Sequence, residues 1–588
     1  MNDNSLIGSP VNRRKFLSAM AAAGALALAR PDAAATAATA AGVDRDKICD
    51  VLVYGATSGG VMAAVQAARS GKSVILIAPY VHLGGMSSSG LGVTDIGNYK
   101  TITGLAREFY YRIYQYYAQP GAWKFEERAH FYREGWSWKQ WGVDGMLAQK
   151  IQMQFLFEPH VAEHVFDQMT REAGVRIVRG KRLDLINGVA KRDARIVTIR
   201  MDDGDHFAAA QYVDATYEGD LMARAGVGYT IGRESNSRYD EQYNGIHPDY
   251  STTVDPYVVR AMPTSGLLPR VQPDLGGRPG DGDGGIQAYN YRLCLTNIER
   301  NRVPIPKPQD YDPQQYELLG RLLEKHPQIK PGKRTAVFVT FGGPKGHFVK
   351  MGKTPNFKTD SNSAGRFSSD MVGANQAWPD GDYVTRERIA KRIRSYDMGL
   401  LWFAAHDRRV PKGVRDAVGQ WGLAKNEFQE NDHWPYRVYV REARRMVGGY
   451  VVTDHDARGL QTANDGVALA SYPIDSHPIK YYVGPDGKVW TDGGMSHHSK
   501  VFPISYRAIC PKRNECTNLV VAGAVSASHA AFGSIRMEPV FMMLGQAAGT
   551  AAAIACTRQV DMQAVPYNTL QRQLAMDGLL TTWPVRDG

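Results

Sequence analysis

The pattern of hydrophobic and polar positions after residue 45 predicts a β-turn-α-β unit. Residues 48–54 form a short apolar run of the kind found in buried parallel strands. An Ala-rich helix is expected over 61–69 and a second strand over 73–77. The unit spans about 30 residues, which is the context that a glycine-rich nucleotide-binding turn requires. The pattern therefore predicts an α/β fold with a Rossmann-like parallel sheet.

The later pattern divides the chain into parts of different character. An apolar strand over 518–524 is followed by a small-residue helix that begins near Pro539. Between 236 and 434 the βαβ pattern is lost, and Gly, Pro, Asp and aromatic residues become frequent. We expect a nucleotide-binding domain made of discontinuous segments around an inserted α+β substrate or cap domain. The expected parts are a signal segment over 1–41, nucleotide-binding segments over 46–235 and 435–575, the insertion over 236–434 and a tail over 576–588.

The first forty residues are typical of a twin-arginine signal peptide. Arg13 and Arg14 precede a weakly apolar Ala- and Gly-rich segment over 19–29, and small residues follow over 33–41. A disordered tail or a membrane anchor is the alternative, but the segment is short for a stable membrane span. We expect the Tat translocase to export the folded protein to the periplasm.

Composition and charge exclude several other classes. The chain has 588 residues, and its 43% hydrophobic and 22% charged residues are ordinary globular values. Its formal net charge of +11 would by itself permit an acidic partner. Its densest basic run, 386–415, alternates with apolar residues as a solvated helix face does, so we expect no nucleic-acid partner. No apolar run after the N-terminus is long enough to span a bilayer.

Five cysteines are too few for a disulfide framework in an exported protein of this length. Cys510 and Cys516 flank a polar loop and are the candidates for a pair. Cys49, Cys294 and Cys556 lie in apolar or mixed contexts and are expected to pack as small hydrophobic residues. We find no zinc-ligand spacing and no nucleophile elbow, so no metal site is expected.

The turn after the first predicted strand carries a nucleotide-binding signature. Gly55 permits a tight turn, Gly60 lets the helix pack closely on the strand, and free N–H groups at the helix start favour a diphosphate. Two positions depart from the usual pattern: Thr57 replaces the second glycine, and Ala78 stands where an acid normally binds the ribose. The candidate phosphate-binding residues are Gly55, Thr57, Ser58, Gly59 and Gly60.

A glycine- and serine-rich loop over 82–95 follows the second predicted strand. It offers many backbone N–H groups and hydroxyls without bulky side chains, which suits a long phosphate-ribityl chain. A flexible surface loop is the alternative. The candidate cofactor contacts in this loop are Gly84, Gly85, Met86, Ser87 and Gly92.

Together these motifs resemble those of the FAD-dependent oxidoreductases whose flavin domain is of the glutathione-reductase type. The similarity continues through 157–163, through 213–221, which resembles an Asp-Ala-Thr-Gly turn, and through 518–550. It implies FAD as the cofactor and a C-terminal helix that aims its positive end at the flavin. A buried packing helix without a ligand is the alternative. The resemblance adds as candidate FAD contacts Ala215, Thr216, Gly523, Glu538 and Gly545.

Oxidation of an alcohol carbon by hydride transfer needs a base for the hydroxyl proton, and histidine suits neutral pH. His529 is the first candidate because it lies between the last predicted strand and the flavin-facing helix. A structural histidine is the alternative, and His497 and His498 are second candidates. Arg536 is a candidate for holding a substrate oxygen or carboxylate, or for pairing with Glu538 as a brace.

Two further features bear on the substrate. Arg441 is predicted to share one helical face with Arg444 or Arg445, and two convergent arginines either bind a carboxylate or form structural ion pairs. For the cofactor, a covalent link between the flavin and His82 is an alternative to non-covalent binding. An insertion over 109–141 is rich in aromatic residues, which either bind sugars or pack as a lid on the core. They are Tyr110, Tyr111, Tyr114, Tyr116, Tyr117, Trp123, Trp136, Trp138 and Trp141.

These features predict an exported FAD-dependent oxidoreductase that oxidises a hydroxylated small molecule, such as a sugar, a glycoside or another alcohol. Because the periplasm holds little free NAD(P)H, the expected electron acceptor is a quinone, a haem protein or oxygen. One alternative is a fumarate-reductase-like ene-reductase or desaturase acting on a carboxylate. From another class, the alternative is a polysaccharide lyase or carbohydrate-binding protein that keeps a nucleotide fold.

Overall fold

The structure is a computed structural model that describes most of the chain. The residues described are 42–584 apart from 136, 139–141, 327–337 and 344–345. The expected signal segment over 1–41 therefore lies outside the described residues, as do Trp136 and Trp141 of the aromatic insertion.

The largest sheet has the strand order β5-β2-β1-β8-β7-β6, and β25 also pairs with β8. Its strands are β1 (Ile48–Tyr54), β2 (Val74–Ala78), β5 (Arg176–Arg179), β6 (Val189–Arg192), β7 (Arg195–Arg200), β8 (His206–Asp214) and β25 (Leu519–Val521). Five of them, β5, β2, β1, β8 and β25, run parallel, whereas β6 and β7 form an antiparallel hairpin that leads into β8. The predicted α/β fold with a parallel sheet is confirmed.

Helices cover the parallel strands, which are therefore buried along most of their length. Residues 51–54 of β1 and all of β2 are buried, as their continuous apolar sequences predict. The helix α3 (Ser58–Arg69) connects β1 to β2, and α7 (Pro159–Glu172) precedes β5. Because β8 pairs with β1 on one side and β25 on the other, segments far apart in the sequence build one domain.

The predicted small-residue helix is α15 (Glu538–Arg558), and its backbone touches that of α3. A Cβ atom at Gly545 would lie 1.9 Å from the carbonyl oxygen of Gly59, and one at Gly549 would lie 2.3 Å from that of Ala63. Only glycine allows so close an approach. The expectation that no apolar run after the N-terminus is long enough to span a bilayer is wrong for α15, which alone among the described helices has the length and composition to do so. However, 83% of its most apolar stretch is buried inside the protein.

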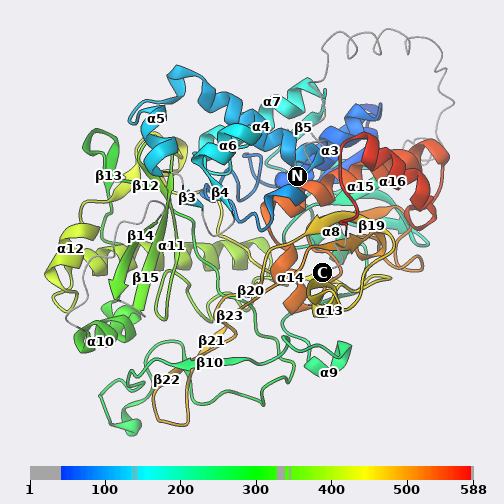
Figure 1. Cartoon of the computed structure of the whole chain (residues 1–588). Helices are drawn as coiled ribbons and strands as arrows, with labels where there is room; N and C mark the ends of the chain where they lie inside the picture. The colour runs from blue at the N-terminus through cyan, green and yellow to red at the C-terminus, as the bar shows by residue number, and fades with distance from the viewer. Residues whose placement is uncertain (1–41, 136, 139–141, 327–337, 344–345, 585–588) are drawn as a thin grey trace, which may run out of the picture.

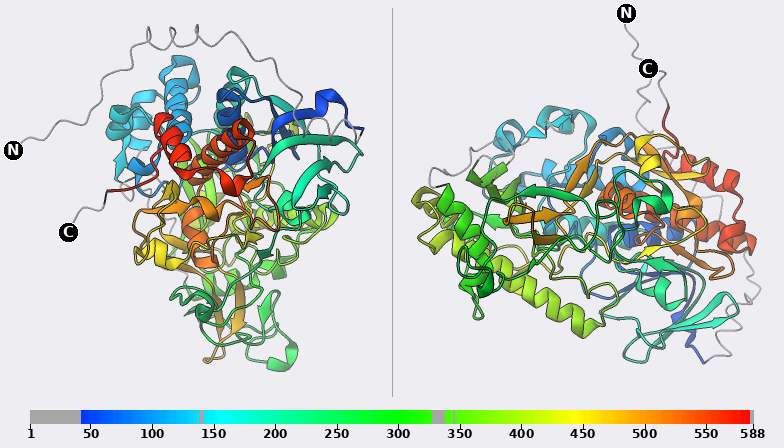
Figure 2. Two further views of the ribbon diagram at one scale, coloured as in Figure 1. Left: turned by 90° about the vertical axis from the view of Figure 1, so that its right-hand side faces the viewer. Right: turned by 90° about the horizontal axis from the view of Figure 1, so that it is seen from below.

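The inserted region forms a second body of α+β structure. Its six-stranded sheet has the order β13-β17-β12-β16-β15-β14. The elements are β12 (Leu295–Thr296), β13 (Arg302–Pro304), β14 (Phe338–Gly343), β15 (Gly346–Thr354), β16 (Lys358–Ser363), β17 (Gly422–Ala424), α10 (Glu317–Lys325), α11 (Tyr383–His406) and α12 (Lys412–Val418). In Figures 1 and 2, α10 and α12 lie at the end of the molecule opposite α15 and α16 (Tyr567–Met576).

A four-stranded sheet crosses the domain boundary that we expected at 434/435. Its order is β10-β22-β21-β11, and it forms the lobe at the bottom of Figure 1. The strands β10 (Pro248–Ser251) and β11 (Val271–Gln272) come from the insertion, whereas β21 (Lys480–Val483) and β22 (Val489–Asp492) come from the C-terminal segment. The hairpin β21–β22 therefore belongs, by its pairing, with the inserted region.

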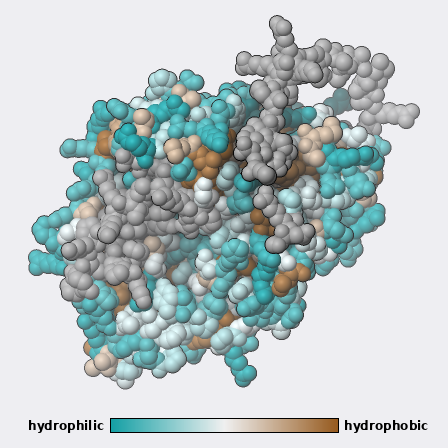
Figure 3. All heavy atoms as spheres, in the orientation of Figure 1, coloured by the Kyte–Doolittle hydropathy of each residue, from teal (hydrophilic) through white to brown (hydrophobic). Residues whose placement is uncertain are grey.

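The basic run over 386–415 lies mostly on α11, as expected of a solvated helix face. Ile389 and Ile393 are buried on one side of this helix, whereas Arg388, Lys391 and Arg392 are exposed on the other. On the face of the molecule seen in Figure 3, hydrophilic residues predominate and hydrophobic residues form small scattered groups.

The first part of the aromatic insertion packs into the core. In α4 (Gly104–Ala118), Tyr110 and Tyr117 are fully buried, and Phe109 stacks on Phe166 of α7 with ring centroids 4.4 Å apart. Trp123 donates its indole N–H to the carbonyl oxygen of Tyr117 at 2.9 Å. For these residues the packing supports the interpretation as a lid buried on the core.

The proposed pairing of Cys510 with Cys516 is wrong, since all five cysteines are free. The two side chains are buried in different hydrophobic clusters, Cys510 in the cluster that contains Val53 and Cys516 in the one that contains Leu52. Adjacent residues of β1 point to opposite faces of the sheet, so the two thiols are separated by the sheet itself.

The contact between α3 and α15 leads to a stability prediction. Substitution Gly545→Ala places a methyl group against the carbonyl oxygen of Gly59, so the helices must separate. We expect the free energy of unfolding to fall by about 1–3 kcal/mol, measured by urea denaturation of the FAD-loaded protein. The control is Gly121→Ala, where an added Cβ meets nothing within 4 Å. Equal effects of the two substitutions would contradict the packing described here.

Candidate functional site

The glycine turn after β1 meets the end of β8. A Cβ atom at Gly55 would lie 2.8 Å from Thr216, and one at Gly60 would lie 3.1 Å from the Cβ of Ala215. The hydroxyl of Thr57 donates to the carbonyl oxygen of Ala215 at 2.7 Å and accepts the N–H of Gly60 at 3.2 Å. Thr57 thus caps α3 with its side chain, which explains how threonine replaces the usual second glycine.

The loop over 84–87 lies beside this turn and reaches the start of α15. The N–H of Gly84 donates to the carbonyl oxygen of Ala56 at 2.8 Å. Ser87 donates to one carboxylate oxygen of Glu538 at 3.0 Å, and Tyr217 donates to the other at 2.7 Å. The Tyr217 hydroxyl also accepts the N–H of Met86 at 3.0 Å. Burial raises the pKa of Glu538.

The remaining predicted cofactor contacts divide into two groups. Gly523 packs on the carbonyl oxygen of Thr216, where its Cβ atom would lie at 2.3 Å, and Gly545 packs on α3. Gly92 lies apart from them, against the carbonyl oxygen of Phe157. His82 stacks on Tyr436 with ring centroids 3.3 Å apart.

A cavity of about 350 Å³ lies at the carboxyl ends of β1, β2 and β8. It is lined by Gly55 and Thr57 from the turn, Tyr80 from the segment after β2, and Thr216 and Glu218 from the segment after β8. Ligands of parallel α/β sheets bind at this edge. The position therefore fits a nucleotide cofactor.

The start of α3 also fits the diphosphate of such a cofactor. Within the described residues, the backbone amides of Ser58 and Gly59 have no hydrogen-bond acceptor. Unsatisfied amides at a helix start, together with the helix dipole, form an anion-binding site. The chain thus supplies the donors that FAD would need at this point.

Three buried arginines surround Tyr439 in the region between α15 and the inserted region. The guanidinium carbons of Arg441 and Arg292 lie 4.8 Å and 5.6 Å from its ring centroid, and Arg536 donates to its hydroxyl at 3.0 Å. Each arginine has an aspartate partner. The pairs are Arg292 with Asp360 at 2.7 Å, Arg441 with Asp370 at 2.9 Å and Arg536 with Asp475 at 2.7 Å.

His477 lies at the rim of this cluster. Its Nδ1 is 2.7 Å from an oxygen of Asp370, while its Nε2 lies 3.8 Å from the nearest oxygen of Asp475. The side chain of His477 is 20% exposed. Burial, together with the charge of Arg441, lowers the pKa of His477. A carboxylate only accepts hydrogen bonds, so Nδ1 carries the proton and Nε2 is left as an acceptor.

His529, the predicted base, lies in the interior behind His477. It is 1% exposed, its Nδ1 is 2.8 Å from Glu442 and its Nε2 is 3.3 Å from Ser476. Both ring nitrogens thus have partners, which supports the structural alternative. Its role as the base stays a prediction that this geometry does not favour.

The predicted helix containing Arg441, Arg444 and Arg445 is wrong. Residues 441–444 are irregular, and Arg445 begins the short strand β18 (Arg445–Met446), which pairs with β9 (Tyr229–Thr230). The three guanidinium groups point to separate acids, since Arg444 pairs with Asp220 and Arg445 with Glu234. These separate ion pairs override the helical spacing of the charges.

The site residues predicted from the sequence do not include His477, Asp370, Asp475 or Tyr439. One signal was present: Asp475 and His477 are two positions apart at the end of the short strand β20 (Ile474–Ser476), and such residues share a face of the strand. Asp370 and Tyr439 lie in irregular segments, and no periodic pattern marks them.

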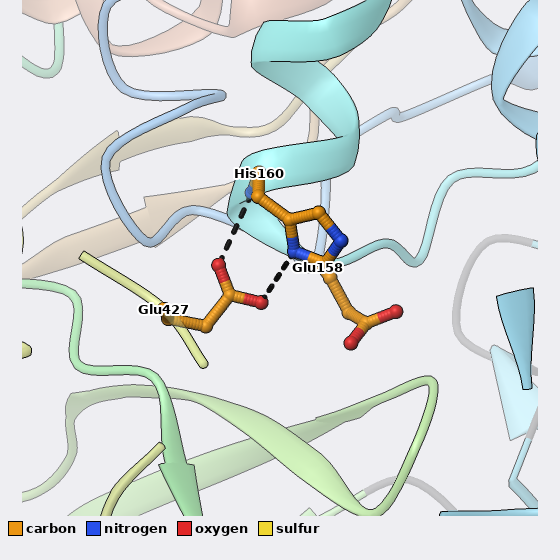
Figure 4. Close-up of side chains that lie close together, drawn as sticks. All are labelled: Glu158, His160 and Glu427. Atoms are coloured by element: carbon orange, nitrogen blue, oxygen red, sulfur yellow. Dashed lines mark hydrogen bonds and ion pairs between the residues drawn. The ribbon is translucent and has the colours of Figure 1, made fainter. Parts of the chain in front are cut away.

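A second charged cluster, shown in Figure 4, joins α7 to the inserted region. The Nδ1 of His160 is 2.7 Å from Glu427, and carboxylate oxygens of Glu158 and Glu427 and a ring nitrogen of His160 lie close enough together to bind one metal ion. However, the ammonium of Lys358 lies 2.6 Å from both glutamates. Lys358 therefore already supplies the positive charge that a metal ion would bring.

Comparison with known proteins assigns the chain to a family. Residues 50–574 match the family described as FAD dependent oxidoreductase, which is most of the sequence. The chain belongs to this family; it is an oxidoreductase, and its cofactor is FAD. No curated protein matches the sequence.

Several solved structures are similar to parts of the chain. OxyS anhydrotetracycline hydroxylase from Streptomyces rimosus is 14% identical over 32% of this chain and 36% of its own, with a TM-score of 0.23. The THI4 protein of Thermovibrio ammonificans is 14% identical over 38% and 76%, with a TM-score of 0.21. The thioredoxin reductase of T. acidophilum is 18% identical over 33% and 40%, with a TM-score of 0.16. The chain matches about a third of the length of OxyS, and similarity at these scores carries no argument about its activity.

The cluster in Figure 4 leads to a second stability prediction. Substitution Lys358→Met leaves Glu158 and Glu427 buried without their cation, and we expect a loss of about 3–5 kcal/mol in the free energy of unfolding. The control is Lys412→Met, which removes an exposed ion pair with Asp416 and should cost under about 1 kcal/mol.

Urea denaturation at neutral pH measures both variants. Equal small losses would contradict the role of Lys358. A rise in the stability of the wild-type protein on addition of Zn²⁺ or Mn²⁺ would show instead that the glutamates bind a metal ion.

Proposed function

We propose that the protein oxidises a neutral, hydroxylated small molecule, with His477 as the base that takes the hydroxyl proton. The observation that carries this proposal is the pair of His477 and Asp370, in which a buried carboxylate holds a partly exposed imidazole at 2.7 Å. A base within reach of substrate, held by a second group, is what hydride transfer from an alcohol requires.

FAD, when bound, would supply the acceptor for a hydride from the substrate carbon. His477 accepts the hydroxyl proton at Nε2, because Nδ1 donates to Asp370. Asp370 fixes the tautomer and stabilises the imidazolium that forms. Burial opposes ionisation of Asp370, but Arg441 and His477 outweigh it and lower the pKa of Asp370, so this carboxylate stays charged.

The ion pairs around Tyr439 support a neutral substrate. Arg292, Arg441 and Arg536 each face an aspartate, so no guanidinium group of this cluster is left to neutralise a substrate carboxylate. This counts against the fumarate-reductase-like alternative. Aspartate oxygens and the Tyr439 hydroxyl are partners that suit the hydroxyl groups of a sugar, a glycoside or another alcohol.

We also propose that the FAD-loaded protein is exported through the Tat translocase and works in the periplasm. The support is the sequence of residues 1–41 together with a cofactor that is made in the cytoplasm. A quinone, a haem protein or oxygen then accepts the electrons, since little NAD(P)H is present outside the cytoplasm.

The role of His477 is tested by substitution. In His477→Gln the base is lost, and we expect the rate of anaerobic flavin bleaching to fall by about 10²–10⁴-fold. A panel of sugars, alcohols and carboxylic acids first identifies a substrate that bleaches the wild-type flavin. The exposed His498→Gln serves as the control. If His529→Gln abolishes bleaching while His477→Gln does not, the base is His529; bleaching by carboxylic acids alone contradicts the proposed substrate class.

The pH dependence gives a second test of the same residue. A base must be neutral to accept a proton, so activity is lost as the pH falls through the pKa of His477. Because that pKa is lowered, we expect the acidic limb of kcat/KM to lie below the ordinary histidine value of about 6.5. A limb above this value, or one that persists in His477→Gln, would assign the titration to another group.

Export is tested at the paired arginines. The double substitution Arg13→Lys and Arg14→Lys keeps the charge and removes the Tat signature, so we expect the flavoprotein to stay in the cytoplasm. Cell fractionation and flavin absorbance measure its distribution, with Arg30→Lys as the control. Equal periplasmic amounts of the double variant and the wild type would refute Tat export.

A further inference from the structure

The end of β2 has no acid to bind the ribose of FAD. In Rossmann sites an acidic residue near this point accepts the ribose hydroxyls. Here the position is Ala78, which is fully buried, and Pro79 and Tyr80 follow it. If a carboxylate binds the ribose hydroxyls of FAD in this protein, it must therefore come from another part of the chain.

Three carboxylates line the cavity at the carboxyl ends of β1, β2 and β8: Glu218, Asp220 and Glu387. Two of them are already engaged. Asp220 accepts from both terminal nitrogens of Arg386 at 2.7 and 2.8 Å, and Glu387 accepts from Arg182 at 2.9 Å.

Glu218 is the carboxylate with spare capacity. It is 5% exposed, and its one hydrogen bond among the described residues is a long one, from the indole N–H of Trp378 to Oε1 at 3.4 Å. Among the described residues, its Oε2 has no hydrogen-bond donor. A carboxylate accepts about four hydrogen bonds, so Glu218 is able to receive both hydroxyls of a ribose.

Arg437 lies beside Glu218 in the same cavity. Its side chain is 12% exposed, its guanidinium carbon is 4.5 Å from the ring centroid of Tyr80, and its contact with Glu218 is a loose 3.8 Å. No closer carboxylate partner is found among the described residues. The planar guanidinium fork is thus free to bind a diphosphate, and Gly55 and Thr57 line the same cavity.

We propose that Glu218 binds the ribose hydroxyls of the AMP half of FAD in place of the missing acid at the end of β2, and that Arg437 binds the diphosphate. The proposal rests on FAD as the cofactor and not on the proposed substrate. The cavity volume of about 350 Å³ lies at the lower end of the range for small-molecule sites, which suits one half of a dinucleotide.

The ribose contact is tested with two competing ligands. The full chain is loaded with FAD, and its displacement by ADP and by 2′,3′-dideoxy-ADP is followed through the fluorescence of the released flavin. We expect the wild-type protein to prefer ADP by about 10- to 100-fold, because two hydroxyls donate to one charged carboxylate. In Glu218→Gln and in Glu218→Ala this preference should fall below about 3-fold.

A ratio of two affinities in one sample does not depend on the folded fraction, so a partly unfolded variant still gives an answer. Glu387→Gln, which removes a paired carboxylate of the same cavity, should keep the preference. If Glu218→Gln keeps it too, Glu218 does not bind the ribose. Failure of ADP to displace FAD from the wild-type protein would show that this cavity is not the AMP site.

The diphosphate contact is tested by the preference for ADP over adenosine. Arg437→Gln should reduce it by about 10- to 100-fold, whereas Arg182→Gln, whose guanidinium is already paired with Asp202 and Glu387, should leave it unchanged. An unchanged preference in Arg437→Gln would overturn this part of the proposal. None of these measurements involves substrate oxidation, so they stand apart from the test of His477.

Discussion

The contact between the backbones of α3 and α15 is the constraint on which the rest of the molecule depends. It exists because Gly59, Gly545 and Gly549 carry no side chains where the helices cross. The helix α3 begins at the predicted phosphate-binding turn, and α15 begins at Glu538, which accepts a hydrogen bond from Ser87 of the second glycine loop. Holding the two helices together therefore holds the two loops together. It also brings two positive helix ends toward the edge of the sheet where we predict that the negatively charged dinucleotide binds.

On the other side of the site, charge is balanced before any ligand arrives. The arginines around Tyr439 are buried, and a buried guanidinium without a partner is costly. The aspartates Asp360, Asp370 and Asp475 remove that cost by forming ion pairs with them. Because these ion pairs leave no unpaired charge to attract a charged ligand, the site distinguishes ligands by the positions of their hydrogen-bonding groups. His477 is connected to this network by its hydrogen bond to Asp370.

Much of the fold could be predicted from the sequence because its signals are local. The glycine turn, the helix α3 and the strand β2 are consecutive, and the small residues of α15 mark a close helix contact by composition alone. The site could be predicted only in part because its pairs are distant: His477 and Asp370 are 107 positions apart. The spacing of Arg441, Arg444 and Arg445 predicted a helix, yet tertiary ion pairs decided the backbone there. Likewise, the pairing of the hairpin β21–β22 with β10 and β11 places it with the inserted region, and its own sequence does not indicate this.

Lys358 has a consequence for how molecules reach the interior. It lies on the inserted region, yet it is bonded to Glu158 at the start of α7 in the nucleotide-binding domain. Separation of the two domains would break the ion pairs of Lys358 with Glu158 and Glu427 and leave these buried charges without partners. This cost disfavours a hinge motion at this contact. We therefore expect the two domains to stay together at the contact between Lys358 and Glu158. A ligand of the proposed site at His477, whose side chain is 20% exposed, therefore has to bind without a large domain movement.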